Sequence, residues 1–296
     1  MLVVDISTVR KLLRDWLARQ VQTGKLSWLD EKVEQLSQDC SERLLFITFS
    51  SVPRYTGKAD LALTAADLKM AEAARMGWRP QQWSLDQVGR TLLLLSLPAQ
   101  DAQQYCDLLE KLFSAADVNE QIALYQSLPL LPYPDLFVRR AAEGLRTNIS
   151  AVFDAIALNN PFPGDYFSKS QWNQMILKAV FVGSPLHLVQ QLDERANADL
   201  ARMLSDYAHE RWAAKREVTP ELWRLVGPFL NEQFVADLKT ALETADKSQQ
   251  IAAVIACKQS TSPSAQALLS EYAEIRDEVD NSQLDWKTFS QAYLAA

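Results

Sequence analysis

Hydrophobic residues recur at spacings of three and four along nearly the whole chain, and alternation with a period of two is almost absent. Residues 12–17 and 26–36 are the first segments with this spacing. Side chains three and four positions apart lie on one face of an α-helix, so the pattern predicts amphipathic helices rather than half-buried strands. The apolar runs 44–49 and 92–97 would suit strands by composition, but no hairpin signal flanks them, and we interpret both as buried helices.

Helix starts are marked by a capping side chain followed three positions later by an acid or an amide. A proline directly after Thr219 marks another start, because proline is favoured in the first turn of a helix. These signals support the helical prediction independently of the hydrophobic pattern. The capping pairs are Thr64 with Asp67, Ser84 with Gln87, and Asp117 with Glu120.

The cluster Pro129, Pro132 and Pro134 is the largest break in the pattern. It predicts an N-terminal helical part, residues 1–128, and a C-terminal helical part, residues 129–296, with one continuous helical domain as the alternative. We expect an all-α fold: a multi-helix array that is either an α-solenoid-like stack of helical hairpins or an irregular bundle.

Three helices are expected directly after this break. The first runs through residues 137–158 as one stripe of apolar positions, and the loop 159–165 ends it. A second begins at Ser170 and closes at Gly183, and a third covers about residues 194–214. Together they form the central segment of the chain.

Composition and charge narrow the class of protein. The chain has 296 residues, 48% of them hydrophobic, and a net charge of −7. A negative balance repels phosphate backbones and anionic lipids, so we expect no nucleic-acid partner. The longest purely apolar stretch, residues 92–95, is far too short for a membrane span, and Asp5 follows the N-terminus at once, unlike a secretory signal. We expect a soluble, cytoplasmic protein without direct membrane insertion.

Cysteine and metal chemistry are sparse. Cys40, Cys106 and Cys257 are odd in number and far apart, which is typical of reduced structural thiols. Asp206 and His209 lie three residues apart and could share a metal, but a di-iron bundle needs a second such pair with further glutamates. A solvated helix face explains the two side chains better, and we expect no metal and no cofactor.

The central segment also contains the candidate binding residues. On a helical wheel Arg211 falls on the apolar stripe, where its guanidinium would need a partner, and pairing with a carboxylate is commoner than ligand recognition. Aromatic residues crowd this neutral region, so a pocket for a small aromatic or prenylated metabolite is a hypothesis beside simple core packing. Its residues would be Arg139, Arg146, Asn148, Trp172, Asn173, Tyr207 and Arg211.

Arg139, Arg140 and Arg146 cluster with Glu143 on the polar side of the helix predicted for residues 137–158. Such a cluster could hold an anionic substrate, although a solvated helix face is the commoner explanation. No Gly-x-Ser-x-Gly, Gly-x-Gly-x-x-Gly, phosphate-binding loop or Cys-x-x-Cys motif occurs in the sequence. No catalytic residue is therefore assigned. If the protein is an enzyme, Glu143 and His209 are the candidate proton carriers.

Six segments of the central region resemble the EboA family of bacterial metabolite-traffic proteins, and together they cover about residues 130–229. They are residues 139–149, 157–163, 172–185, 192–197, 206–212 and 220–223. The resemblance implies a cytoplasmic protein of a small gene cluster. The other members of that cluster resemble a membrane prenyltransferase, a metal-dependent hydrolase, a sugar-phosphate-cyclase-like enzyme and TIM-barrel proteins.

This resemblance favours an accessory role in making or moving a small metabolite towards the periplasm, by binding the metabolite or partner proteins. The expected partners are the other proteins of the cluster, among them the membrane prenyltransferase. Two alternatives stay open: a biosynthetic enzyme of the same pathway, with its active site in the central segment, and a purely structural helical scaffold. The residues favour a role other than catalysis.

Overall fold

The computed structural model describes residues 4–38 and 41–295, and within these ranges the regular structure is helical. The predicted all-α fold is confirmed, since the β-type pairing in the described part of the chain is limited to one isolated bridge between Asp60 and Ser84. Cys40 and the first three residues lie outside the described ranges. Among the residues described, no helix combines the length and the apolar character that a bilayer span requires.

The chain forms two compact units, residues 1–168 and residues 169–296. The proline cluster offered as a boundary therefore lies inside the first unit, and its role as a limit between folding domains stays a prediction. The helices of the first unit are α1 (Ile6–Ala18), α2 (Thr23–Gln38), α3 (Glu42–Thr56), α4 (Ala65–Ala74), η1 (Pro80–Gln82), α5 (Leu85–Leu94), α6 (Ala102–Ala115), α7 (Val118–Ser127), η2 (Leu128–Leu130), η3 (Pro134–Phe137), α8 (Val138–Gly144), α9 (Ser150–Ala157) and α10 (Phe162–Tyr166).

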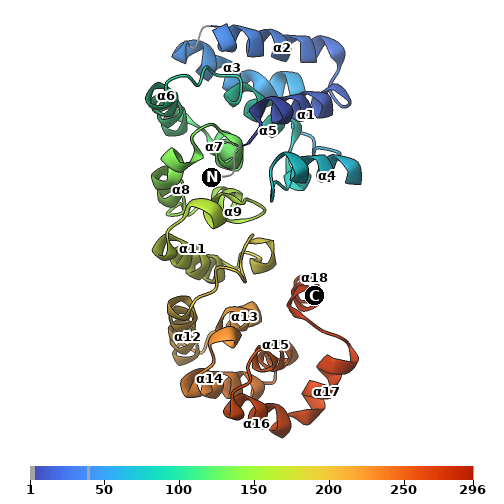
Figure 1. The fold of residues 1–296 in the computed structure, drawn as a ribbon, viewed down its shortest axis with the longest axis vertical. Helices are drawn as coiled ribbons and strands as arrows, with labels where there is room; N and C mark the ends of the chain where they lie inside the picture. The colour runs from blue at the N-terminus through green and yellow to red at the C-terminus, as the bar shows by residue number, and fades with distance from the viewer. Residues whose placement is uncertain (1–3, 39–40, 296) are drawn as a thin grey trace. The chain divides into compact units, whose positions relative to one another are not determined.

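Helix α5 is the centre of the first unit, and it packs against α1, α2, α3 and α7 (Figure 1). Its side chains are buried almost all round, including the charged Asp86 and Arg90. Gly89 allows α3 to come close, because a Cβ atom there would lie 2.8 Å from a methyl carbon of Val52. Helix α7 then packs on α9, so neighbouring elements stack in order along the unit.

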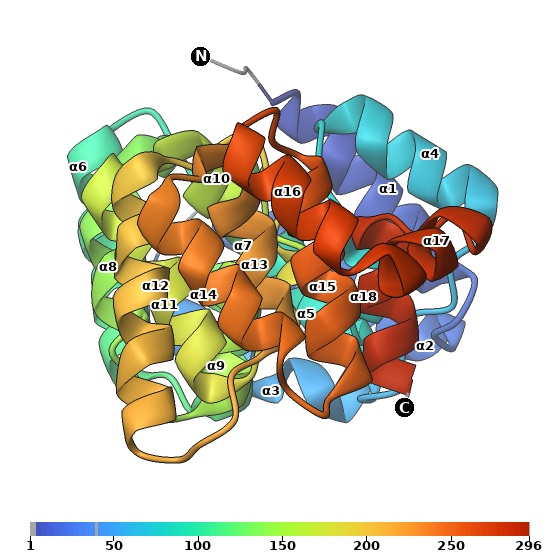
Figure 2. The same cartoon turned by 90° about the horizontal axis from the view of Figure 1, so that it is seen from below.

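The second unit is built around α15, which packs against α13, α14, α16, α17 and α18 (Figure 2). Ala252, Ala253 and Ala256 of α15 are fully buried, and such small side chains permit close helix packing. The helices of this unit are α11 (Lys169–Val182), η4 (Leu186–Leu188), α12 (Ala198–Ala213), η5 (Pro220–Leu222), α13 (Trp223–Val226), η6 (Gly227–Phe229), α14 (Glu232–Leu242), α15 (Lys247–Lys258), α16 (Pro263–Glu271), α17 (Ala273–Asn281) and α18 (Trp286–Ala295).

The capping residues predicted from the sequence lie at the starts of helices, as expected. Thr64 with Asp67, and Asp117 with Glu120, form complete capping boxes at α4 and α7. At α5 the Gln87 side chain accepts the backbone N–H of Ser84 at 2.8 Å. The run 44–49 lies within α3, as expected, whereas residues 92–94 end α5 and residues 95–97 form the turn after it. Neither run is a strand.

The single long helix expected for residues 137–158 is wrong. The chain instead forms α8 and α9, separated by a turn in which the Thr147 hydroxyl accepts the N–H of Ile149. Gly144 ends α8 against the Tyr125 side chain, and a Cβ atom there would overlap the Tyr125 hydroxyl and lie 2.8 Å from Ile156. The break therefore depends on tertiary contacts, which the hydrophobic pattern does not contain.

The two described cysteines are buried and free. Burial raises the pKa of Cys257 to about 12, and burial also raises the pKa of Cys106. Because the thiolate is the reactive form, both side chains have the character of structural thiols, as expected.

Candidate functional site

Trp172 on α11 is the most deeply buried of the predicted binding residues, with 1% of its surface exposed. The guanidinium carbon of Arg195 lies 4.6 Å from the centre of the indole ring, which is a cation–π distance. The indole N–H is buried, and within the described ranges no acceptor lies within hydrogen-bonding distance. An unpaired buried donor costs roughly 1–3 kcal/mol, so a polar group that reached this N–H would be stabilised.

Asn173, the neighbour of Trp172, pairs with Asn197 at the start of α12. Each side-chain amide donates to the oxygen of the other, at 3.2 and 2.9 Å. The Asn197 oxygen also accepts the backbone N–H of Leu200 and thereby caps α12. Asn173 thus joins α11 to the start of α12, which is the packing role that the sequence left open beside ligand binding.

His209 was expected on a solvated face of α12, and its side chain is 44% exposed, but it also has a buried partner that the sequence did not indicate. Its Nε2 lies 2.6 Å from the Asp237 carboxylate of α14, and Asp237 is buried. The other Asp237 oxygen accepts the Ser205 hydroxyl at 2.6 Å. Serine and histidine therefore both bind the carboxylate and not each other, an arrangement that ties α12 to α14 and does not activate the serine.

Tyr207 and Arg211 lie further along the same helix. Tyr207 is half-buried, and so is Arg211, which the helical wheel had placed on the buried stripe. The Arg211 Nε–H donates to the backbone carbonyl of Glu217 at 2.9 Å, just beyond the end of α12. The wheel misplaces Arg211 because it belongs to the last turn of the helix, where the chain turns away. A cation there is also favoured by the helix dipole.

A second polar pair in this unit was not found from the sequence. The Glu221 side chain is buried, and one of its oxygens accepts the backbone N–H of Leu186 at 3.3 Å. The other oxygen lies 3.9 Å from Nδ1 of His187, and neither of these atoms has a hydrogen-bond partner among the described residues. The available signal is that Glu221 directly follows Pro220 in a first helical turn, where the helix dipole favours an acid.

The four predicted residues of the first unit lie on or just after α8. Arg139 is 88% exposed on its side chain and lies 3.6 Å from Glu143, while Arg146 and Asn148 are exposed. Arg140, between them, donates to Glu110 of α6 at 2.8 Å. The predicted anion-binding cluster is thus an open surface of ion pairs. Of the predicted residues, the first unit contains Arg139, Glu143, Arg146 and Asn148, and the second contains Trp172, Asn173, Tyr207, His209 and Arg211.

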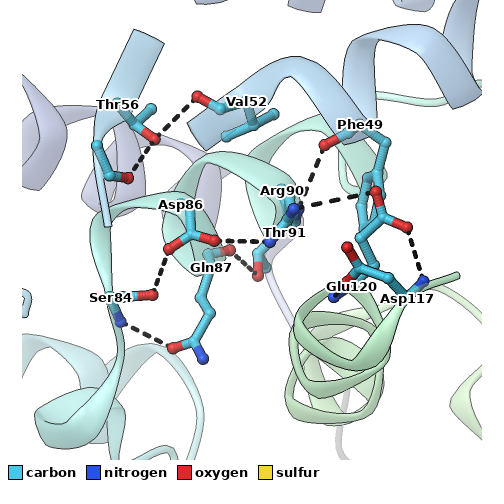
Figure 3. Close-up of polar contacts among 11 residues, drawn as sticks. Phe49, Val52, Thr56, Ser84, Asp86, Gln87, Arg90, Thr91, Asp117 and Glu120 are labelled. Carbon is cyan, nitrogen blue, oxygen red and sulfur yellow. Dashed lines mark hydrogen bonds and ion pairs between the residues drawn. The ribbon is translucent and has the colours of Figure 1, made fainter. Parts of the chain in front are cut away.

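The first unit also buries a charge cluster that sequence reasoning missed (Figure 3). Arg90 of α5 donates to Asp86 at 2.6 Å and to the Phe49 carbonyl at 3.3 Å, and it lies 4.0 Å from Glu120 of α7. Its side chain is 3% exposed. Charges four positions apart in an otherwise apolar helix were the available signal, because such charges must find partners.

Comparison with known proteins gives the family. The family model described as metabolite traffic protein EboA matches residues 9–227, well over half of the chain. The chain belongs to the EboA family. No curated protein and no solved structure gives a significant match to the chain. The EboA match is wider than the resemblance over residues 130–229, because it begins at Val9 on α1.

The EboA match ends at Gly227, before α14, so the C-terminal helices α14–α18 lie outside it. Two buried side chains from these helices bind the EboA-matched part. Asp237 of α14 binds Ser205 and His209, and Gln249 of α15 accepts the indole N–H of Trp223 at 2.9 Å. Gln249 also donates to the backbone carbonyl of Val218. Within the second unit, buried hydrogen bonds therefore join the helices inside the EboA match to the helices outside it.

Proposed function

We propose that this EboA-family protein serves metabolite traffic as an accessory binding protein, which holds a small metabolite without converting it. The observation on which the proposal rests is how the predicted chemical groups are used. His209 binds Asp237, Asn173 binds Asn197, and Arg211 binds the Glu217 carbonyl. These contacts hold helices and helix ends in place, which supports a binding protein over the alternative of a biosynthetic enzyme.

The two candidate proton carriers illustrate the point. Glu143 lies on an open surface beside Arg139, where water screens both charges. His209 is held by a buried carboxylate, and the nearby Ser205 hydroxyl donates to that same carboxylate. A general base needs a free lone pair within reach of a substrate proton. Neither side chain combines a buried site with such a lone pair.

A ligand position in the second unit is proposed at Trp172. Its unpaired indole N–H can donate to a polar group, and its ring surface is already in contact with the Arg195 cation. Aromatic or prenylated metabolites offer the apolar surface that such a ring binds. In this proposal the metabolite is passed to other proteins of the gene cluster, among them the membrane prenyltransferase, on its way towards the periplasm.

Native mass spectrometry of the protein purified from its own host tests the proposal. We expect a small molecule to stay bound, and Trp172→Phe, which removes the N–H and keeps the ring, to reduce the bound fraction. Trp223→Phe is the matched control, because it removes a buried indole N–H that is paired within the protein to Gln249. It should destabilise the fold and leave the bound fraction unchanged.

Three other outcomes would contradict the proposal. Turnover of a pathway intermediate by the purified protein alone would favour the enzyme alternative. Stable partner chains on a protein with no small molecule would favour the scaffold alternative. Equal loss of the molecule in both tryptophan variants would remove Trp172 as the ligand position.

A further inference from the structure

A pocket of about 280 Å³ in the first unit is lined by residues of α1 and α2 and by one residue of α5. None of its residues was a candidate from the sequence. Its volume is slightly below the range of about 300–1,000 Å³ that is typical of ligand pockets, so it suits a small ligand. The pocket is lined by Ser7, Arg10, Lys11, Arg14, Asp30, Val33 and Leu92.

The four lining residues of α1 occupy positions 7, 10, 11 and 14, so they share one face of the helix. The adjoining face of α1 is buried and includes Val9, Leu13 and Trp16. The core side of α1 therefore fixes the helix in place, and the neighbouring side presents three cations to the pocket. Asp5 caps the helix through the backbone N–H groups of Ser7 and Thr8, so that acid is engaged at the helix end.

The three cations differ in their partners. Arg14 binds Asp30 of α2 through two hydrogen bonds, at 2.5 and 2.6 Å, and this bonding raises the pKa of Arg14. Arg10 and Lys11 face the same pocket, and among the described residues neither forms an ion pair. The pocket therefore has two uncompensated positive charges in a chain with a net charge of −7.

Two lining residues are apolar, and Ser7 adds a hydroxyl. Val33 of α2 is half-buried, and Leu92 of α5 is 3% exposed. A hydrophobic wall beside two unpaired cations suits a ligand with an anionic end and an apolar body. A bare inorganic anion would leave the apolar wall in contact with water.

We propose that this pocket binds a small organic phosphate, with the phosphate between Arg10 and Lys11 and the apolar substituent against Val33 and Leu92. A phosphate monoester has a charge of about −1.5 to −2 at pH 7, which matches the two unpaired cations, whereas a carboxylate matches one. Arginine suits the oxygen geometry of phosphate, and lysine binds it as a point charge. The inference goes beyond the proposed function, because this pocket is a second binding position, formed by other residues than the one proposed at Trp172.

Isothermal titration with phenyl phosphate tests the site directly. We expect saturable binding to the natural chain and at least tenfold weaker binding to the double variant Arg10→Gln/Lys11→Gln. The control is Arg54→Gln/Lys58→Gln, which removes one arginine and one lysine from exposed positions of the same unit that face no described pocket. It should bind phenyl phosphate like the natural chain.

Two further measurements separate the phosphate end from the apolar end. Val33→Phe should fill the pocket and weaken phenyl phosphate binding with both cations intact. For the natural chain, affinity should rise between pH 5 and pH 7.5, because the second phosphate pKa is about 6. Benzoate, a carboxylate with the same ring, should bind weakly and without that rise.

The proposal is overturned if phenyl phosphate does not bind, or if it binds the double variant as tightly as the control. Inorganic phosphate binding as tightly as phenyl phosphate would overturn the role of the apolar wall. Native mass spectrometry keeps this result apart from the proposed function. If phenyl phosphate binds and no host molecule is found on the natural chain, the pocket stands and the traffic proposal is contradicted. If a host molecule is found and phenyl phosphate does not bind, the traffic proposal stands and the pocket assignment is wrong.

Discussion

Helices α1 and α8 belong to the same unit and present similar basic faces, yet their surroundings differ. On α8 the arginines lie beside carboxylates: Arg139 beside Glu143, and Arg140 against Glu110. On α1, Arg14 is paired, while Arg10 and Lys11 face a pocket with an apolar wall. The α8 cluster was the one selected from the sequence. The α1 cluster is the one in which two cations have no ion-pair partner among the described residues.

The difference shows that the count of basic residues on a helix face says little about binding. What matters is which acids neighbouring helices bring to that face. Arg19, which directly follows α1, illustrates this, because Asp67 of α4 reaches it at 2.9 Å. Arg90 of α5 is the extreme case of a paired cation, since it is buried between two acids.

The largest effect on the free energy of unfolding is expected at Arg90. Arg90→Met would leave Asp86 and Glu120 buried without their cation, and removing one partner of a buried ion pair costs about 3–5 kcal/mol. We expect the free energy of unfolding in urea to fall by that amount. Arg90→Lys is the control, because it keeps the charge and should lose less. Equal stability of Arg90→Met and the natural chain would show that the cluster in Figure 3 is not a paired one.

A smaller effect on the unfolding free energy is expected at Asp67, the acid that pairs with Arg19. Burial would raise the pKa of Asp67, but hydrogen bonds from Thr64 and the Arg19 cation outweigh it and lower that pKa from 3.8 to about 2. A lowered pKa in the folded state adds stability above pH 4, and this stability is lost as the pH falls towards 2. The difference in unfolding free energy between the natural chain and Asp67→Asn should shrink by roughly 1–2 kcal/mol between pH 5 and pH 2.5. A constant difference would contradict the pairing.

Much of the fold was predictable because its signals are local. Spacings of three and four gave the helices, and the cap at Thr64 and the proline at position 220 gave their starts. The break at Gly144 was missed because its cause is Tyr125, nineteen residues away in the sequence and in contact only after folding.

The candidate sites were harder to predict for the same reason. The partner of His209 is Asp237 on the next long helix, and a helical wheel of α12 cannot contain it. The α1 face at positions 7, 10, 11 and 14 was visible in the sequence. What the sequence could not supply was the wall of Val33 and Leu92 from two other helices, or the pairing of Arg14 with Asp30.

A third effect concerns the paired face of α8. Arg140→Gln removes a contact with Glu110 and a cation–π contact with the Phe113 ring at 5.5 Å, so we expect a loss of about 1 kcal/mol in unfolding free energy. Arg139→Gln is the matched variant, since Arg139 is almost fully exposed and should change stability little. Neither variant should alter phenyl phosphate binding. Weaker binding in either one would place the anion site on α8 and contradict the distinction from α1.

The smallest effect on stability is expected at the pocket itself. Arg10→Gln/Lys11→Gln removes no described ion pair and should change the unfolding free energy by no more than about 0.5 kcal/mol. The same variant should lose the rise in Tm that phenyl phosphate gives the natural chain, because a ligand stabilises only the folded state that binds it. Arg140→Gln should show the reverse, with a lower Tm and an unchanged rise. If both variants lost stability and kept the rise in Tm with phenyl phosphate, the cations of α1 would be structural. The basic faces of α1 and α8 would then not differ in function.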